Sequence, residues 1–137
     1  MDCRGAMRLL LDTHIWIWAL LRPDKISREV RRQLDNPRNE LYLSPVSIWE
    51  AHHLHRRGKF RLKKTFTEWI DQAFREVPVL EAPFNFTVAS ETSRIHLPQP
   101  DPGDLLLAAT ASVLDLTLVT NDSQFIECGW LKVLVNS

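Results

Sequence analysis

The chain has few cysteines, no long apolar segment and no net charge, and each absence narrows the classes of protein to consider. Its two cysteines, Cys3 and Cys128, lie near opposite ends of the 137 residues. Two such thiols form neither a disulfide framework nor a zinc-ligand pattern, so a reducing cytoplasm is the expected compartment. Asp12 and His14 interrupt the apolar run near the N-terminus, and no small-residue cleavage site follows it. We therefore expect neither a signal peptide nor a membrane span.

The formal charge of zero neither favours nor excludes a polyanionic partner, so the distribution of charge along the chain has to decide. An apolar content of 45% and a charged content of 25% are ordinary for a globular protein. The length is typical of one domain with its own core. We expect residues 1–6 to form an N-terminal tail, with Met7 as an alternative start, and residues 7–137 to form the domain.

Short apolar runs alternate with helical patterns along the chain. Strands are expected at 8–12, 41–44, 117–120 and 132–135, with a weaker one at 77–80 that contains a proline. Helices are expected at 13–21, 28–34, 45–57, 66–76 and 85–94, and from 102 onward, several of them after a capping residue. This alternation predicts a single α/β domain with a mostly parallel central sheet flanked by helices.

Two aspartates follow predicted strands. Asp12 ends the first strand, and Asp122 lies two residues beyond Thr120, where the strand "LTLVT" ends. Ligands of open parallel sheets bind beyond the carboxyl ends of the strands, and both aspartates are expected at that edge. The alternative for each is an ordinary loop or helix N-cap aspartate.

Two more carboxylates lie on apolar helix faces. Glu50 is in line with Val46 and Leu54, where an unpaired carboxylate is costly to bury. A salt bridge to Arg or Lys is the alternative explanation for Glu50. Asp104 also shares a face with apolar residues, although the helix dipole favours an acid in the first turn. Asp101 is expected to be the N-cap of that helix.

Asp12, Glu50, Asp104 and Asp122 lie on four separate elements that can converge at one edge of the sheet. Four carboxylates close together raise one another's pKa values unless a cation neutralises them. Oxygen ligands without a cysteine cluster favour Mg²⁺ or Mn²⁺. One or two such ions holding a phosphodiester and activating water make a phosphoryl-transfer or nuclease site.

The sequence resembles the PIN-domain ribonucleases, and most closely the VapC toxins of prokaryotic toxin–antitoxin pairs. The resemblance covers nearly the whole chain from Met7 and is carried by "LLLDTHIWIWAL", "SPVSIWEA", "DPGDLLLAATA" and "LVTNDSQF". It implies a PIN-like α/β fold and RNA cleavage dependent on Mg²⁺ or Mn²⁺. It also implies a cognate antitoxin protein as partner, and a homodimer.

The resemblance further assigns roles to individual residues. The metal-binding and catalytic acids are Asp12, Glu50, Asp104 and Asp122, Thr120 orients a carboxylate or a water, and Asp101 supports the site as a cap. Two positions depart from the family pattern. Leu105 stands where many relatives have a basic residue, and His14 stands where part of the family has asparagine or serine. Neither departure removes a carboxylate, so we expect the activity to survive.

A basic segment follows Glu50. The stretch "HHLHRRGKFRLKK", residues 52–64, holds six Lys or Arg and no acid. A solvated helix end explains such a run structurally, because cations are favourable at a helix C-terminus. The functional hypothesis is a phosphate-contacting patch, with Arg56, Arg57, Lys59 and Arg61 as candidate RNA-binding residues.

Other hypotheses are compatible with parts of the pattern. Trp16 and Trp18 are expected in the core, although an apolar helix in a small domain also suits a dimer or antitoxin interface. A degenerate PIN-like module that binds RNA or protein without catalysis is the main alternative function. A receiver-like signalling domain fits less well, because it leaves Glu50 on its helix unexplained.

Overall fold

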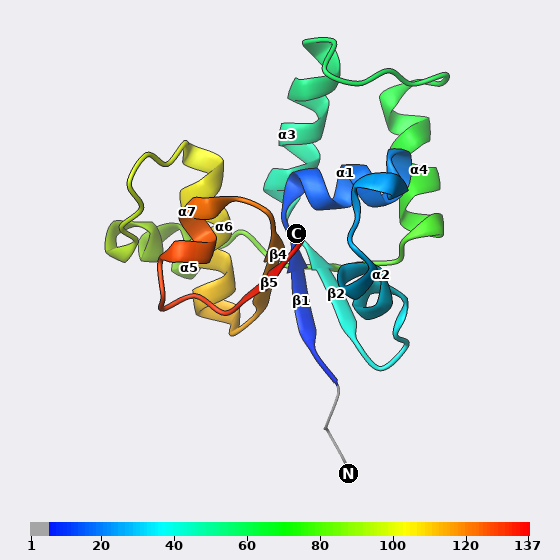
Figure 1. Ribbon diagram of the computed structural model, residues 1–137. Helices are drawn as coiled ribbons and strands as arrows, with labels where there is room; N and C mark the ends of the chain where they lie inside the picture. The colour runs from blue at the N-terminus through cyan, green and yellow to red at the C-terminus, as the bar shows by residue number, and fades with distance from the viewer. Residues whose placement is uncertain (1–5) are drawn as a thin grey trace.

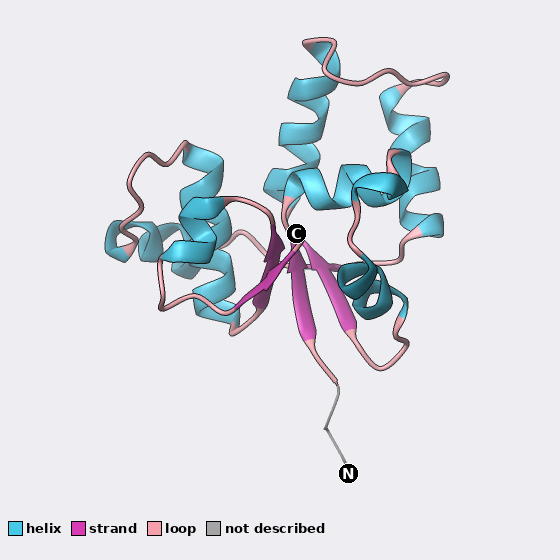
Figure 2. Ribbon diagram, in the orientation of Figure 1, coloured by secondary structure: helices cyan, strands magenta, loops and turns pink. Residues whose placement is uncertain are grey.

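The computed structural model describes residues 6–137, so the expected N-terminal tail lies outside the described residues except for Ala6. A sheet of five strands runs through the molecule in the order β3-β2-β1-β4-β5, and every pairing is parallel (Figure 2). Leu9 at the centre of the sheet pairs with Leu41 on one side and Thr117 on the other. The strands are β1 (Arg8–Leu11), β2 (Glu40–Leu43), β3 (Leu80–Glu81), β4 (Thr117–Thr120) and β5 (Val133–Val135).

The helices form two groups on either side of the sheet (Figure 1). One group holds α1 (Thr13–Leu21), the 3₁₀ turn η1 (Pro23–Lys25), α2 (Arg28–Asp35), α3 (Pro45–Arg56) and α4 (Phe66–Glu76). The other holds α5 (Phe86–Glu91), the 3₁₀ turn η2 (Thr92–Arg94), α6 (Pro102–Leu114) and α7 (Ser123–Glu127). Covering both faces leaves most of the central strands β1 and β4 buried, as their short apolar runs predict, whereas both residues of the edge strand β3 are exposed.

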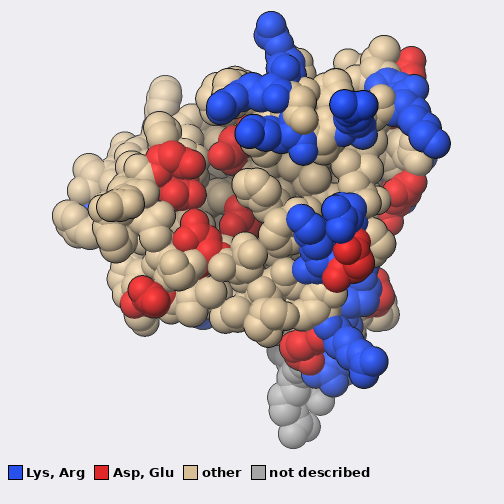
Figure 3. Space-filling model, turned by 45° about the horizontal axis from the view of Figure 1, so that its top comes forward, with Lys and Arg blue, Asp and Glu red and all other residues tan. Residues whose placement is uncertain are grey.

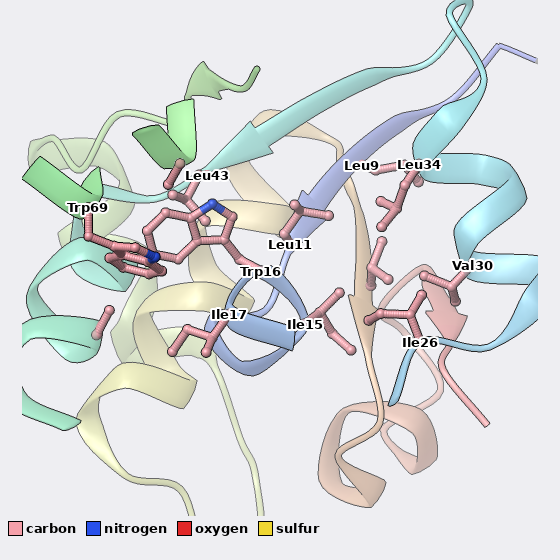
Figure 4. Packing of buried hydrophobic residues seen from close by; sticks show 13 residues of the cluster. Leu9, Leu11, Ile15, Trp16, Ile17, Ile26, Val30, Leu34, Leu43 and Trp69 are labelled. Atoms are coloured by element: carbon pink, nitrogen blue, oxygen red, sulfur yellow. The ribbon is translucent and has the colours of Figure 1, made fainter. Parts of the chain in front are cut away.

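Each group of helices packs on its own core. Leu9 and Leu11 of β1 belong to the cluster under α1–α4, whereas Leu10 belongs to the cluster under α5–α7. This alternation is the two-residue period of a strand that is covered on both faces. In the first cluster the rings of Trp16 and Trp69 lie 5.3 Å apart between centroids (Figure 4). Trp16 is therefore a core residue as predicted.

The helix ends follow the expected capping signals in most places. Ser27 and Ser44 accept hydrogen bonds from the backbone amides of Val30 and Val46, and α3 gives way at Gly58, whose φ of 74° suits glycine. Thr65 likewise accepts from the amide of Glu68, but the return bond from the Thr65 amide to the Glu68 side chain, which would complete a capping box, is not among the hydrogen bonds of residues 6–137.

Three other elements differ from expectation. The strand expected at 77–80 is reduced to Leu80–Glu81, because Pro78 has no amide proton to donate to a sheet. The short α7 and the turn η1 were not expected, since neither is long enough to give an apolar period. No helix of residues 6–137 combines the length and the apolar character needed to span a bilayer.

Candidate active site

Four acidic side chains meet at the carboxyl edge of the sheet. Asp12 follows β1 and is the N-cap of α1, while Asp122 follows β4 and is the N-cap of α7. Glu50 comes from the middle of α3, and Asp104 from the first turn of α6. They share a cavity of about 280 Å³ with lining residues Asp12, Thr13, His14, Glu50, Asp101, Asp104, Leu107, Asn121 and Asp122. Figure 3 shows carboxylates around a hollow of the surface.

Thr120 fixes the Asp12 carboxylate. The buried Thr120 hydroxyl donates to Asp12 Oδ2 at 2.6 Å and accepts from the Asp122 amide at 3.0 Å. One hydroxyl at the end of β4 thus links the two strand-end aspartates. Burial raises the pKa of Asp12, and the bond from Thr120 opposes that rise. The structure therefore gives Thr120 the orienting contact that the sequence resemblance suggested.

The buried Thr13 hydroxyl holds the Glu50 carboxylate and is itself bonded to the buried Ser47 hydroxyl. Thr13 Oγ1 lies 2.7 Å from Glu50 Oε1 and 2.8 Å from Ser47 Oγ. An ionised carboxylate only accepts, so Thr13 gives its single proton to Glu50 and accepts from Ser47. None of the ion pairs formed by residues 6–137 includes Glu50, so a salt bridge does not explain its place in the apolar stripe.

The surroundings of Glu50 disfavour the ionised form of its carboxyl group. Burial raises the pKa of Glu50, and the charges of Asp101 and Asp12 raise it further, while the Thr13 bond opposes the rise. Sequence reasoning missed Thr13 and Ser47. The available signal was their position, since Thr13 directly follows Asp12 and Ser47 lies one helical turn before Glu50.

Gly103 leaves room for the Glu50 carboxylate. A Cβ atom at this position would lie 2.9 Å from Glu50 Cδ and 3.3 Å from Asp101 Oδ1. Carbon atoms in favourable contact stay about 3.5–4.0 Å apart, so any larger residue displaces the carboxylate. Sequence reasoning missed this residue as well. Its signal was a glycine in the first turn of a helix, where propensity disfavours it.

Asp101 and Asp104 form a reciprocal capping box. Asp101 Oδ1 accepts from the Asp104 amide at 2.8 Å, and Asp104 Oδ2 accepts from the Asp101 amide at 3.2 Å. Asp101 is thus the N-cap, as predicted, and Asp104 serves the helix end through a hydrogen bond as well as through the dipole interaction expected of it. Burial, followed by the charges of Asp101, Asp122 and Asp12, raises the pKa of Asp104 to about 6.

The donor chemistry of the cavity fits a hard divalent cation. The four acids offer only oxygen, and none of them enters an ion pair with a described Lys or Arg. Three of the four, Asp12, Glu50 and Asp104, have raised pKa values, first because of burial and then because of the charges of neighbouring carboxylates. No three or more His, Cys, Asp or Glu side chains of residues 6–137 are arranged to hold an ion as they stand. A cation would therefore have to draw these carboxylates closer together.

The candidate RNA-binding residues lie outside this cavity. All four are exposed and follow or end α3. Lys59 and Arg61 line a neighbouring groove that His14 also lines, whereas Arg56 and Arg57 line neither hollow. The structure thus places two of the four beside the acidic cavity.

Comparison with known proteins gives one family and a set of similar folds. The sequence model of the PIN domain matches residues 9–131. No curated protein gives a significant match. VapBC2 from Rickettsia felis, bound to a DNA fragment from its promoter, contains a chain that is 21% identical to this one. The alignment covers 96% of this chain and 100% of that chain, with a TM-score of 0.66.

Two further structures are similar to the same extent. The DNA-bound VapBC of Salmonella typhimurium has 17% identity, coverage of 96% and 99%, and a TM-score of 0.70. VapBC-1 of nontypeable Haemophilus influenzae has 19% identity, coverage of 94% and 98%, and a TM-score of 0.65. At such identities the likeness establishes a shared fold.

Proposed function

The chain belongs to the PIN-domain family, and from this premise we propose that it is a metal-dependent endoribonuclease. One observation carries the proposal: four carboxylates from four separate elements line a single cavity, and none of them forms an ion pair with a described Lys or Arg. Partly buried acids gathered in one cavity need compensation for their charge, and a divalent cation is the compensation that oxygen-only donors suit. RNA is the proposed substrate.

The residues of the cavity divide into ligands and supports. Asp12, Glu50, Asp104 and Asp122 would hold Mg²⁺ or Mn²⁺. When bound, such an ion supplies positive charge and Lewis acidity toward a phosphate and a water molecule. Thr120 keeps Asp12 in place, and Asp101 holds the start of α6 through its cap.

The support of Glu50 comes from both sides of the cavity. Thr13 donates to one of its oxygens, and Gly103 gives the space that the carboxylate fills. With these contacts the carboxylate oxygens are oriented before a substrate arrives, which reduces the reorganisation that catalysis requires. Asp104, whose pKa is about 6, must release its proton before it can serve a cation well.

We also propose a partner and a setting. The similar structures include VapBC proteins from Rickettsia felis, Salmonella typhimurium and Haemophilus influenzae, and a further similar structure, VapBC-5 of Mycobacterium tuberculosis, is described as a member of the VapBC family of toxin–antitoxin systems. By analogy, this chain is a VapC-type toxin that a cognate antitoxin protein inhibits, that forms a homodimer, and that acts in the cytoplasm. The analogy rests on the shared fold together with the acidic cavity.

A cleavage assay tests the proposed function. The purified protein is incubated with structured RNA in Mg²⁺, in Mn²⁺ and in EDTA, beside the variants Asp12→Asn and Glu50→Gln. The matched control is Asp71→Asn, an exposed acid of α4 outside the cavity. We expect discrete cuts that require the metal, persist in the control and vanish in both site variants.

Titration of Mn²⁺ into the same proteins by calorimetry separates the remaining outcomes. A folded wild type that neither cuts RNA nor binds the metal contradicts the proposal and favours the PIN-like binding module. Metal-dependent cutting that survives Glu50→Gln would show that a different group does the chemistry.

A further inference from the structure

A second groove lies beside the acidic cavity. It has a volume of about 580 Å³, within the ~300–1,000 Å³ of small-ligand sites. Its walls come from α1, from the turn η1, and from the end of α3 with the segment after it. The lining residues are His14, Ile17, Trp18, Leu21, Arg22, Lys25, Leu54, Lys59, Phe60 and Arg61.

The groove carries charge of one sign. Four of its lining residues are Arg or Lys, and none is acidic. Arg22 is paired with Asp24 at 2.9 Å, but no ion pair of residues 6–137 includes Lys25, Lys59 or Arg61. Three exposed cations thus face the groove with their charge uncompensated, as a polyanion requires.

Positive and negative charges are also unevenly distributed along the whole chain. Its first 64 residues hold 14 of the 17 Lys and Arg but seven of the 17 Asp and Glu. Figure 3 shows Lys and Arg gathered on one side of a hollow that carboxylates line on the other. The field therefore draws a polyanion toward the side that holds α1–α3 and the segment after α3, while the carboxylates repel it unless a cation intervenes.

Aromatic rings give the groove flat apolar faces. Trp18 is only half-buried, and the exposed His14 lies near it with ring centroids 5.9 Å apart. Lys25 Nζ lies 5.1 Å from the centre of the Trp18 ring, so a flexible cation covers the face that a planar group would otherwise stack on. Rings flanked by Lys and Arg are the usual means of binding unpaired bases and their phosphates.

His14 joins the groove to the acidic cavity, because it lines both. We propose that the groove binds an unpaired nucleotide of the RNA strand, next to the phosphate held at the carboxylates. The base stacks on Trp18 with His14, whose ring is tilted by 54° to that of Trp18, against its edge, and Lys25 and Arg61 contact flanking phosphates. The proposal rests on the proposed function, since it deepens the substrate from RNA in general to RNA that is single-stranded beside the cut.

RNA binding without metal tests the groove apart from catalysis. Fluorescence anisotropy of a short end-labelled single-stranded RNA is measured in EDTA at several salt concentrations. The variant Lys25→Gln/Arg61→Gln removes two proposed phosphate contacts. At ~0.7 per contact for a single strand, we expect the slope of log affinity against log salt to become shallower by about 1.4.

The matched control is Arg38→Gln/Arg75→Gln, which loses the same charge at exposed positions outside the groove. Its slope is expected to equal that of the wild type. An equal change in both double variants would show a general charge effect and overturn the proposal. Wild-type affinity in the groove variant would do the same and would assign the groove to another ligand, such as a peptide.

Trp18→Leu tests the stacking itself, since leucine keeps an apolar body but has no ring. Loss of one stacked base is worth about 1–3 kcal/mol, so single-stranded RNA should bind at least about fivefold more weakly. Binding of the same sequence as a duplex should not change. An equal loss for both RNAs, or none, contradicts stacking. If Trp18→Leu does not fold, His14→Ala at an exposed position gives the same readout.

The two proposals fail in different ways. If RNA is never cut but its binding in EDTA depends on the groove as described, the nuclease proposal fails and the groove stands. If RNA is cut but its binding ignores all groove variants, the groove proposal fails and the nuclease stands.

Discussion

Replacing Gly103 with alanine places a methyl group against the Glu50 carboxylate. The new Cβ would lie 2.9 Å from Glu50 Cδ and still nearer to Glu50 Oε2, whereas favourable carbon contacts begin near ~3.5 Å, so the carboxylate must retreat by roughly 0.6 Å or more. It cannot do so without changing its 2.7 Å bond from Thr13. Catalytic groups tolerate displacements of about 0.5 Å, and misplacement by about 1 Å costs about 100-fold in rate.

The fold should tolerate the change. The neighbouring atoms belong to the far end of a flexible side chain, and alanine is a better helix former than glycine by about 0.5–1 kcal/mol. We therefore expect Gly103→Ala to lower RNA cleavage by about 100-fold while its melting temperature stays within a few degrees of the wild type. Cleavage, Mn²⁺ affinity and thermal unfolding are measured on the same preparation.

A second-site change separates crowding of Glu50 from other effects of the methyl group. Glu50→Asp shortens the side chain by one methylene and vacates the space that the alanine Cβ needs. In a double-mutant cycle, Gly103→Ala should cost far less in the Glu50→Asp background than in the wild type. Additive losses of Mn²⁺ affinity, or a wild-type rate for Gly103→Ala alone, would refute the reasoning.

Three further predictions follow from the cavity. Thr120→Val removes the 2.6 Å bond to Asp12, so it should raise the Asp12 pKa further and cost about 1.5–3 kcal/mol of stability. Thr120→Ser keeps the hydroxyl and should stay close to the wild type. NMR titration measures the pKa, and thermal unfolding measures the stability. In EDTA, the contribution of Asp104 to stability should fall as pH rises from 3.8 to about 6, because folded Asp104 keeps a proton that the unfolded chain releases. The difference in melting temperature between the wild type and Asp104→Asn should therefore change over this range, and a constant difference would contradict the prediction. Mg²⁺ at a hundredfold its Kd should stabilise the wild type by about 2.7 kcal/mol and Asp12→Asn far less, as differential scanning fluorimetry can show.

The sequence by itself determined the fold class, most element boundaries and the acidic set. Apolar period, capping residues and strand ends are local signals, and the parallel topology then puts Asp12 and Asp122 at one edge. The position of Glu50 in the apolar stripe of its helix also indicated, from the sequence alone, that the charge of this side chain needs compensation. Roles as metal ligands and RNA contacts stay predictions until the experiments above are done.

Only the tertiary structure decided what surrounds those acids. The Thr13–Glu50 bond spans 37 residues and the Thr120–Asp12 bond spans 108, distances over which no sequence period carries information. By helix propensity alone Gly103 is a poor residue for its position, and only the close approach of α6 to Glu50 explains why a glycine stands there. The groove beside His14 likewise exists because η1 and the segment after α3 meet across α1. Periodicity predicts which face a residue occupies, but the partner on that face is set by packing between distant segments.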